Sequence, residues 1–410
     1  MASTTFVIIG ASLAGAKGAE ALREAGYSDR IVLIGDETEV PYERPPLSKQ
    51  YLQGKQELEK AFVHPAEWYG DHDIDLRLGT TAAAIDRDGR SVTLADGTRV
   101  AYDALLLATG SSPRRLPVPG GNLEGVHYLR RIPDCEQIKA TLRTASRVVF
   151  VGGGWIGLEV TAAAREAGIE AVVLEADELP LGRVLGPEIA RVFADMHRQH
   201  GVDLRPGSHV TEILSEGGRA SGVLLADGTR IGADAVVVGI GAAPNIGLAE
   251  AAGLTIDNGV RVDASLRSSD PHVFAAGDVA NAFHPLLGKH IRVEHWDNAR
   301  KQPAVAARAM LGEEAVYDRV PYFFTDQYDL GMEYSGYIEP GGYDDVVVRG
   351  DLEGREFLAF WLADGRVKAG MNVNIWDVNK QIQQLVQTGG RVDAAKLADA
   401  DTPLDQVAAS

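Results

Sequence analysis

The first feature of the chain is a short apolar stretch that a glycine-rich turn follows at once. Phe6 to Ile9 are four apolar residues, mostly β-branched, and this pattern predicts a buried parallel strand. The turn Gly10-Ala11-Ser12-Leu13-Ala14-Gly15 comes next, and residues 13–25 favour a helix that ends at a C-cap glycine. A second apolar strand, residues 30–34, is followed by an acidic residue. This order of strand, tight turn, helix, strand and acid is typical of a dinucleotide-binding unit.

Each part of this unit suits a pyrophosphate and a ribose. Gly10 permits the tight turn, and Gly15 lets the helix pack closely on the strand. The helix N-terminus offers amide groups and a partial positive charge to a pyrophosphate. Asp36 follows Gly15 by 21 residues, which is where a carboxylate accepts hydrogen bonds from a ribose. The middle glycine of the usual pattern is Ser12, whose small side chain still allows the backbone to approach a ligand.

The same pattern returns later in the chain. Residues 148–151 predict another apolar strand, and the turn at residues 152–157 keeps all three glycines. The helical stretch at residues 155–167 is closed by Gly168, and the strand at residues 171–174 is followed by Glu175. Two complete units predict two dinucleotides, and hence two cofactors that meet in one enzyme.

A second element is also repeated. Residues 94–110 read LADGTRVAYDALLLATG and residues 225–241 read LADGTRIGADAVVVGIG, with nine of 17 positions identical. In both, Asp-Gly predicts a hairpin turn before an apolar strand that ends at small residues. A single Asp-Gly hairpin could arise by chance. Because both elements recur in the same order, at offsets of 142 and 131 residues, we infer an internal duplication.

The pattern therefore predicts an α/β fold with two Rossmann-like domains and a C-terminal α+β domain. The first domain is expected to be discontinuous, because a strand at residues 273–276 can rejoin its sheet and bring Asp278 to the cofactor. After Pro321, antiparallel strands and a helix at residues 377–387 mark the third domain. The expected boundaries are 1–115 with 248–321 for the first domain, 116–247 for the second and 322–410 for the third.

Composition narrows the class of protein. A chain of 410 residues that is 45% hydrophobic and 24% charged suits a soluble protein of two or three domains. No apolar run approaches the roughly 18 residues of a membrane span, and a first strand that begins at Thr5 leaves no room for a signal peptide. The net charge of −18 disfavours nucleic acid as a partner. The single cysteine, Cys135, excludes an intramolecular disulfide, so we expect a protein of the reducing cytoplasm. From the charge and the lack of a long apolar run we expect neither a nucleic-acid nor a membrane partner.

Two further groups of residues bear on the chemistry. Residues 41–49 contain three prolines and predict a stiff loop that opens a helix near Leu47. Such a loop either holds its charges, Arg44 and Lys49, against a ligand or is a solvated surface segment, and the pattern leaves both open. The histidines lack metal-ligand spacing, and we expect no metal site. Three of them are expected to be surface or hydrogen-bonded residues: His64, His127 and His284.

Together these pieces resemble the FAD-dependent, pyridine-nucleotide-linked reductases of the glutathione-reductase fold. Within that fold the chain is most similar to the ferredoxin reductases that serve oxygenases. The resemblance runs nearly end to end. It rests on residues 10–15, 45–49 (PPLSK), 108–110 (ATG), 152–159, 276–278 (AGD), 294–296 (EHW) and 326–328 (DQY).

The resemblance implies that the first unit binds FAD. Arg44 and Lys49 would approach the pyrophosphate and the flavin, Ala82 would face the adenine, Asp278 would bond the ribityl chain and Trp296 would lie beside the isoalloxazine. A helix after Trp296, with Asp297 as its N-cap, would support the negative charge of the reduced flavin. The implied FAD-binding residues are Gly10, Ser12, Ala14, Gly15, Asp36, Arg44, Lys49, Ala82, Ala108, Thr109, Gly110, Arg130, Gly277, Asp278 and Trp296.

The second unit would bind the nicotinamide cofactor. Glu175 favours NADH, because a carboxylate at this place accepts from both ribose hydroxyls and repels a 2′-phosphate. Glu159 is either an ordinary exposed helix residue or, as the resemblance implies, an active-site carboxylate paired with Lys49; Lys49, Glu159 and Trp296 are the implied catalytic residues. The residues implied for the nicotinamide cofactor are Gly152, Gly154, Ile156, Gly157, Glu175, Arg183 and Gly241.

The implied activity is a reductase that passes electrons from NADH through FAD, one at a time, to a small 2Fe-2S ferredoxin that feeds an oxygenase. Disulfide reductases, oxidases and peroxidases of this fold need redox cysteines, and residues 45–48 have none, so the electrons would leave the flavin directly. An aromatic exit through Trp296, Phe323 and Phe324 is expected. The alternatives are a rubredoxin or monodehydroascorbate reductase, or a slow redox-sensing flavoprotein like apoptosis-inducing factor.

A basic patch would steer an acidic ferredoxin to an acidic reductase. The candidates are four basic residues near Trp296 in the sequence, although scattered surface charges would give the same pattern. They are Arg292, Arg300, Lys301 and Arg308.

Overall fold

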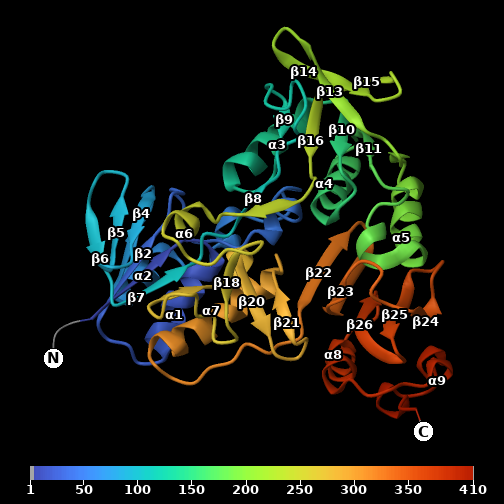
Figure 1. Ribbon diagram of the computed structural model, residues 1–410. Helices are drawn as coiled ribbons and strands as arrows, with labels where there is room; N and C mark the ends of the chain where they lie inside the picture. Colours follow the sequence, from blue (N-terminus) through green and yellow to red (C-terminus); the bar gives the residue numbers. More distant parts are fainter. Residues whose placement is uncertain (1–3, 410) are drawn as a thin grey trace. The chain divides into compact units, whose positions relative to one another are not determined.

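The computed structural model describes residues 4–409 (Figure 1). The contacts within it divide the chain into two compact units. Unit 1 comprises Met1–Arg44, Glu57–Ser112 and Ala243–Pro321. Unit 2 comprises Pro45–Gln56, Pro113–Ala242 and Tyr322–Ser410. Both units are therefore discontinuous in sequence.

The core of unit 1 is a five-stranded parallel sheet with the strand order β19-β7-β1-β2-β3. Four of the strands are almost wholly apolar, because both faces of a parallel sheet are covered, while the edge strand β3 carries Asp75 and Arg77. The predicted return of the late strand to the first sheet is confirmed: Val273 pairs with Leu105 of β7. The strands are β1 (Thr5–Ile9), β2 (Arg30–Ile34), β3 (Ile74–Arg77), β7 (Ala104–Leu107) and β19 (Val273–Ala275).

Helices and two small sheets complete unit 1. Helix α1 packs against α7. Gly18 of α1 also lets the helix lie close to the sheet, because a Cβ there would be 2.7 Å from the Leu106 side chain of β7. The helices are α1 (Leu13–Glu24), α2 (Ala66–Asp71), α6 (Gly247–Ala251) and α7 (Trp296–Met310). The small sheets are β4 (Ala82–Asp86), β5 (Ser91–Leu94) and β6 (Arg99–Ala101), and β18 (Val260–Val262), β20 (Ala280–His284) and β21 (Lys289–Ile291).

Unit 2 contains a second parallel sheet of the same kind, with the order β12-β11-β10-β16-β9. An antiparallel sheet, β13-β14-β15, contains the predicted second hairpin, whose Asp227-Gly228 turn connects β14 to β15. The parallel strands are β9 (Val126–His127), β10 (Arg147–Val151), β11 (Glu170–Leu174), β12 (Asp203–Arg205) and β16 (Ala235–Val238). The antiparallel strands are β13 (Val210–Glu216), β14 (Arg219–Leu225) and β15 (Arg230–Gly232), and the helices are α3 (Ile132–Thr144), α4 (Trp155–Glu166) and α5 (Gly182–Gln199).

The C-terminal part of unit 2 is an antiparallel sheet, β22-β23-β26-β25-β24, that α8 covers. Ile382 of α8 packs on the sheet at Gly370, where a Cβ would lie 2.6 Å from its side chain. The predicted antiparallel strands after Pro321 are confirmed. The elements are β22 (Tyr322–Gln327), β23 (Leu330–Gly336), β24 (Asp345–Asp351), β25 (Glu356–Ala363), β26 (Arg366–Val373), α8 (Asn379–Thr388) and α9 (Ala394–Ala398). Two short strands, β8 (Ser111–Pro113) and β17 (Ala242–Pro244), stand at unit boundaries.

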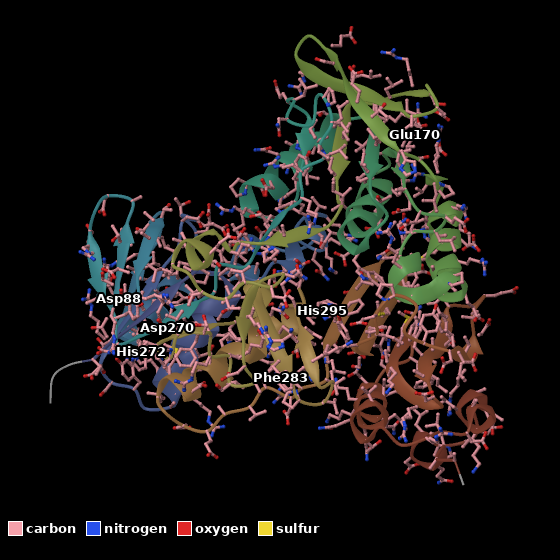
Figure 2. All side chains as sticks on the ribbon, viewed as in Figure 1. Asp88, Glu170, Asp270, His272, Phe283 and His295 are labelled. Atoms are coloured by element: carbon pink, nitrogen blue, oxygen red, sulfur yellow. The ribbon has the colours of Figure 1, made fainter. Side chains whose placement is uncertain are left out.

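Two local predictions are wrong. The proline-rich loop does not open a regular helix at Leu47: Pro45–Ser48 form a short 3₁₀ helix, and hydrogen-bonded turns follow it. Asp297 does not cap α7, because the helix begins one residue earlier and His295, labelled in Figure 2, is its N-cap. Asp297 lies instead in the first turn, where its carboxylate still faces the positive end of the helix dipole.

The three predicted domain boundaries stay a prediction. The contacts group the second dinucleotide-binding copy with the C-terminal sheet, and add Pro45–Gln56 to them. Among residues 4–409, no helix combines the length and the apolar character needed to cross a membrane.

Candidate functional site

The first glycine turn is built so that only glycine fits at two of its positions. Gly10 has a φ of +114°, and a Cβ there would lie 2.1 Å from the carbonyl oxygen of Ala108. A Cβ on Gly15 would lie 1.9 Å from the carbonyl oxygen of Gly10. The Ser12 side chain makes no capping hydrogen bond, so the first amides of α1 keep their hydrogens for a ligand. This turn is a cradle for an anion such as a pyrophosphate.

The second glycine turn repeats this geometry in unit 2. Gly152 has a φ of +101°, and its Cβ would lie 2.4 Å from the carbonyl oxygen of Gly239. A Cβ on Gly157 would lie 2.4 Å from the carbonyl oxygen of Gly152. Gly110 and Gly241, which end the two repeated segments, both have positive φ angles of +65° and +98°. The internal duplication therefore extends from sequence to backbone conformation.

Glu175 is directed at the second turn. Its Oε2 accepts a hydrogen bond of 2.7 Å from the Gly153 amide, and its Oε1 accepts one of 2.9 Å from the Asp177 amide. Arg183 forms an ion pair with Asp177 at 2.6 Å and its side chain is 75% exposed. The negative group, not the arginine, thus stands at the glycine turn. Gly154 is the N-cap of α4, and Ile156 is exposed in its first turn.

Several predicted FAD-binding residues occupy fixed places in unit 1. Arg44 donates hydrogen bonds to Glu37 at 2.9 Å and to the Tyr42 hydroxyl at 3.0 Å. Burial lowers the pKa of the Arg44 guanidinium, but the charges of Tyr42 and Glu37 outweigh burial and raise it. Asp36 lies just after β2 and Ala82 at the start of β4. Arg44 is therefore a half-buried cation that Glu37 and Tyr42 hold in place.

The loop at Gly277 and Asp278 is held on both sides. Gly277 donates its amide hydrogen to the Gln302 side chain at 2.8 Å, and Ser111 donates its hydroxyl to Asp278 at 2.8 Å. A Cβ on Gly277 would lie 3.1 Å from the Ala14 side chain, so this loop adjoins the first glycine turn.

Asn245 locks the segment at the end of β7. Its side chain donates to the Thr109 carbonyl at 2.7 Å, and its own carbonyl accepts from the Thr109 hydroxyl at 2.9 Å. Its amide also donates to the Gly110 carbonyl at 2.9 Å. The backbone that follows Ala108 is thus fixed by a residue that comes directly after β17, just beyond the end of the second repeat.

Trp296 opens α7, and the guanidinium of Arg300 lies 4.8 Å from the centre of its ring, a cation–π distance. Two members of the expected basic patch form ion pairs with neighbouring glutamates. Arg292 pairs with Glu294 and its side chain is only 9% exposed, and Arg308 pairs with Glu313 at 2.8 Å. Arg300 and Lys301 remain as the candidates on this helix.

Lys49 and Glu159 form a buried ion pair in unit 2. The Lys49 Nζ lies 2.8 Å from Glu159 Oε2, and the two side chains are 8% and 3% exposed. The predicted pairing is confirmed, and the alternative of an ordinary exposed helix glutamate is wrong. Ser48 donates a second hydrogen bond to the same oxygen at 2.5 Å. Arg130 stands just before α3 in the same unit, where its amide donates to Asp134.

Cys135 takes no part in these sites as a nucleophile. It is fully buried and donates its thiol to the Leu47 carbonyl at 3.2 Å. Burial raises the pKa of this thiol to about 12, so it stays protonated. The predicted histidines are hydrogen-bonded, as expected: His64 to Glu20, His127 to Thr141 and His284 to the Arg319 carbonyl.

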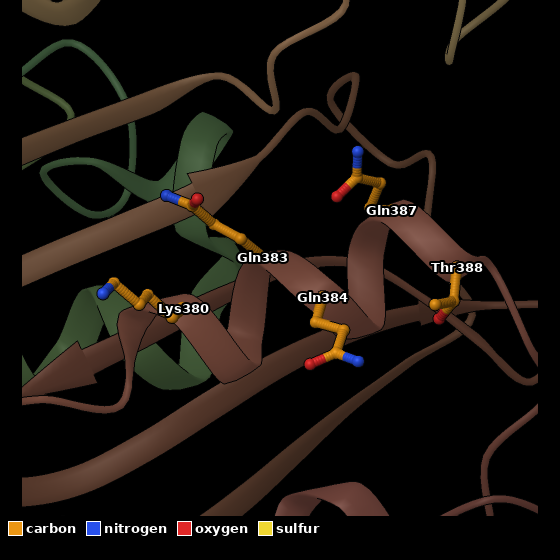
Figure 3. A pocket seen from close by; sticks show the side chains of 5 residues that line it. All are labelled: Lys380, Gln383, Gln384, Gln387 and Thr388. Carbon is orange, nitrogen blue, oxygen red and sulfur yellow. The ribbon is translucent and has the colours of Figure 1, made fainter.

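Sequence reasoning missed the residues that hold these groups in place. Gln302 and Asn245 fix the cradle loops, and Thr325 donates to Glu159 at 2.6 Å. The sequence did offer one sign of such residues: a polar residue at a position where the helical period expects an apolar one, as with Gln302 among the alanines of α7. A pocket over α8 is lined by none of the predicted site residues, and we assign it no role. Its lining residues are Lys380, Gln383, Gln384, Gln387 and Thr388 (Figure 3).

The two cradles fit two dinucleotides, because each combines a tight glycine turn, a helix N-terminus and a following acid, which is the arrangement that binds an ADP moiety. The fold and these sites therefore define a two-dinucleotide oxidoreductase. In the same part of the chain that forms these sites, residues 4–409, no cluster of His, Cys, Asp or Glu is arranged to hold a metal ion.

Comparison with known proteins gives the family. Residues 4–303 match the model of the pyridine nucleotide-disulphide oxidoreductases, and residues 322–408 match the reductase C-terminal domain. The chain belongs to the pyridine nucleotide-disulphide oxidoreductase family. Its class, an oxidoreductase that uses FAD and NAD(H), and its fold are as predicted from the sequence.

The relatives bear out the predicted resemblance to ferredoxin reductases. Rhodocoxin reductase of Rhodococcus erythropolis is 40% identical over 402 residues, which cover 98% of this chain and 93% of that protein. Putidaredoxin reductase CamA of Pseudomonas putida is 38% identical over 100% of this chain and 98% of its own. The crystal structure of the covalent putidaredoxin reductase–putidaredoxin complex matches with a TM-score of 0.95 and 37% identity, over 99% of this chain and 98% of that one.

Proposed function

We propose that this chain is the NADH-dependent reductase of an oxygenase system, which reduces a small 2Fe-2S ferredoxin through FAD. The observation that carries the proposal is the pair of equivalent glycine cradles in a chain whose single thiol is buried. Two cradles require two dinucleotides, and a buried thiol leaves the flavin itself to hand electrons on. Bound FAD supplies the step from a two-electron donor to a one-electron acceptor.

The residues of unit 1 hold the flavin nucleotide in this proposal. Gly10, Ser12, Ala14 and Gly15 let the α1 amides reach the pyrophosphate, and Asp36 accepts from the adenosine ribose. Arg44, fixed by Glu37, adds a permanent positive charge for the phosphates. Asp278, oriented by Ser111, accepts from the ribityl hydroxyls. The further contacts are assigned to Ala82, Ala108, Thr109, Gly110, Gly277 and Trp296.

The residues of unit 2 hold the nicotinamide nucleotide. Gly152, Gly154, Ile156 and Gly157 form the pyrophosphate cradle, with Gly241 and Arg183 at its edges. Glu175 selects NADH, since its carboxylate accepts from the ribose hydroxyls and repels a 2′-phosphate. Lys49 and Glu159 are the catalytic pair: a buried ammonium fixed by a carboxylate can hold a cofactor in one orientation and exclude water from it. Arg130 is assigned to the flavin on the resemblance alone.

The acceptor is assigned from the relatives. One is a component of an anthranilate 1,2-dioxygenase system and another of a biphenyl dioxygenase system, and both are named as ferredoxin–NAD(+) reductases. We assign the same kind of acceptor to this chain, with an oxygenase as the indirect partner. The cytoplasm is the proposed compartment, because it supplies NADH and keeps a lone cysteine reduced; fractionation of the source cells tests this.

The deciding experiment is cytochrome c reduction by the FAD-loaded protein, with and without a 2Fe-2S ferredoxin, using NADH and NADPH side by side. The expected result is a rate that depends strongly on ferredoxin and is far higher with NADH. Rapid ferredoxin-independent turnover with rubredoxin or monodehydroascorbate would favour another acceptor. Slow flavin reduction and indifference to every acceptor would contradict the proposal and favour a sensor.

A further inference from the structure

A chain of buried hydrogen bonds runs through unit 2 and ends on the Glu159 carboxylate. Thr325 and Gln327 come from β22 and His197 from α5, and all three side chains are at most 1% exposed. Thr325 Oγ1 lies 2.6 Å from Glu159 Oε1, Gln327 Nε2 lies 3.2 Å from Thr325 Oγ1, and His197 Nε2 lies 2.8 Å from Gln327 Oε1. We call these three residues the Glu159 relay.

The donors of the relay all point the same way. A carboxylate only accepts, so the Thr325 hydroxyl must donate to Glu159. The hydroxyl has one hydrogen, so it must accept from the Gln327 amide nitrogen. The Gln327 oxygen can then only accept, which requires a hydrogen on Nε2 of His197. The Tyr328 hydroxyl, 3.3 Å from His197 Nδ1, supplies the donor at the far end.

Both oxygens of Glu159 are thereby occupied. Oε1 accepts from Thr325, while Oε2 accepts from Ser48 at 2.5 Å and lies 2.8 Å from the Lys49 ammonium. A carboxylate with donors on both oxygens has one orientation, because any rotation leaves a buried donor unsatisfied. The position of the ammonium is set in turn by the carboxylate.

We propose that Thr325, Gln327 and His197 are positioning residues, through which the C-terminal sheet fixes Glu159 and hence Lys49 for the reaction with the nicotinamide cofactor. This inference rests on the proposed function, since it assigns the relay to the same site. It gives the C-terminal domain a part in the first half of the reaction, flavin reduction, in addition to any contact with a ferredoxin.

The surrounding charges are consistent with a neutral relay. Burial lowers the pKa of His197 to about 4. The hydrogen bond to Gln327 raises this pKa, and the nearby His200 lowers it further. His197 faces Gln327 and Tyr328, with His200 stacked on the Tyr328 ring at 3.7 Å. Around Lys49 the charged groups are Glu159 and Asp326, and the Phe324 ring lies 5.5 Å away. The relay therefore orients the pair without adding a charge of its own.

The first test is single-turnover reduction of the FAD-loaded protein by NADH in three variants. Thr325→Val keeps the shape and removes the donor, Thr325→Ser keeps the donor, and Thr141→Val is the matched control, because its hydroxyl bonds another histidine, His127. Thr325→Val should lower the limiting rate about 10- to 100-fold and change the apparent Kd for NADH less than about threefold. Thr325→Ser and Thr141→Val should stay within about threefold of the wild type.

A second readout does not depend on turnover. In protein labelled with ¹⁵N-histidine, His197, assigned by loss of its signals in His197→Gln, should carry its hydrogen on Nε2 and should not titrate between pH 8 and 6. A hydrogen on Nδ1 would reverse the relay and overturn the proposal. If Thr325→Val does not fold, Gln327→Met tests the next link, with at least a fivefold loss of limiting rate expected.

The outcomes separate the two claims. A wild-type protein whose FAD is not reduced by NADH contradicts the proposed function, while the tautomer measurement still reports on the relay. A wild type that is reduced normally, with Thr325→Val equal to it, contradicts the inference alone. A fall in the NADH affinity of Thr325→Val at an unchanged limiting rate also overturns it, since that result indicates a binding role.

Discussion

Glu175 accepts a 2.7 Å hydrogen bond from the backbone amide of Gly153, which lies between the first two glycines of the second pattern. The contact ties the acid at the end of one strand to the loop that receives the pyrophosphate. A single carboxylate can therefore hold the cradle in shape and distinguish a ribose with free hydroxyls from one that carries a 2′-phosphate.

Replacement of Glu175 by Ala should weaken NADH and lessen the rejection of NADPH. A hydrogen bond to a charged group is worth about 1.5–3 kcal/mol, so the KM for NADH should rise roughly 10- to 100-fold. Steady-state ferricyanide reduction with both nucleotides measures this. The control is Glu170→Ala, which removes an exposed carboxylate at the start of the same strand, where it pairs with Arg147 at 2.8 Å. An unchanged ratio of NADH to NADPH efficiency in Glu175→Ala would contradict the assignment.

Gly10→Ala should abolish FAD binding. The added Cβ would meet the Ala108 carbonyl at 2.1 Å, so either the turn or the end of β7 must move. Gly26→Ala is the matched control, because Gly26 also has a positive φ, of +82°, but a Cβ there meets nothing within 4 Å. The control should lose about 1–2 kcal/mol of stability and keep its flavin. The measurement is flavin absorbance per mole of purified protein. Equal flavin content in both variants would contradict a requirement for glycine at position 10 in FAD binding.

Gln302→Leu should weaken FAD binding through the loop that carries Asp278. The change leaves the buried amide of Gly277 without its acceptor, which costs about 1–3 kcal/mol, or up to about 100-fold in affinity. Gln302→Glu keeps an acceptor at the same place and should bind FAD within about threefold of the wild type. Reconstitution of the apoprotein with FAD, followed by flavin fluorescence, compares them. Equal affinities of the two variants would show that the amide has another acceptor.

Arg300→Glu combined with Lys301→Glu should raise the KM for ferredoxin about tenfold or more and leave ferricyanide reduction unchanged. The reason is that charges near a docking face act on the rate of encounter with a charged partner. The matched control is Arg219→Glu with Arg230→Glu, the same change of charge on the exposed β14–β15 hairpin. If both double variants alter ferredoxin kinetics equally, net charge and not this helix governs docking.

Acid should destabilise the protein partly through His197. The pKa of this residue is about 4 in the folded protein and about 6.5 when unfolded, so the unfolded state binds more protons between these values. Stability is full above about pH 6.5 and falls as the pH drops toward 4, by about 2 kcal/mol at pH 5 for this residue. Burial also lowers the pKa values of His127 and His284, which act in the same direction.

Melting temperatures at pH 7.5 and pH 5 measure this effect. His197→Gln should melt lower than the wild type at pH 7.5, because packing is lost, but should fall less between the two values. His209→Gln, at an exposed histidine, should follow the wild type. A pH-dependent fall in His197→Gln as large as that of the wild type would contradict a buried neutral imidazole.

The glycine turns and their strands could be predicted because their physics is local. A positive φ at Gly10 and an apolar run before it follow from neighbouring residues, and the late strand at Val273 was recognisable by its apolar pattern alone. The start of α7 could not be placed as well: Asp297 is a good N-cap by type, but Trp296 already lies in the helix. Helix ends depend on tertiary packing, which no local rule contains.

The Glu159 relay was beyond local reasoning for another reason. His197 and Gln327 are 130 residues apart, and Thr325 is 166 residues from Glu159. Each member is an unremarkable polar residue in its own element. Thr325 and Gln327 share the buried side of β22, where two apolar residues would be the ordinary expectation. Only the pairing of donors across the fold explains why polar residues stand there.

The discontinuous sheet of unit 1 also sets the order in which the nascent protein can fold. Strand β7 ends at Leu107, but its neighbour β19 begins only at Val273. At about 5–20 residues per second the ribosome needs roughly 8–33 s to bridge this gap. All strands of the second parallel sheet, from Val126 to Val238, leave the ribosome within that interval. The first parallel sheet therefore keeps β7 as an unpaired edge until β19 is synthesised, and the second parallel sheet can be completed before it.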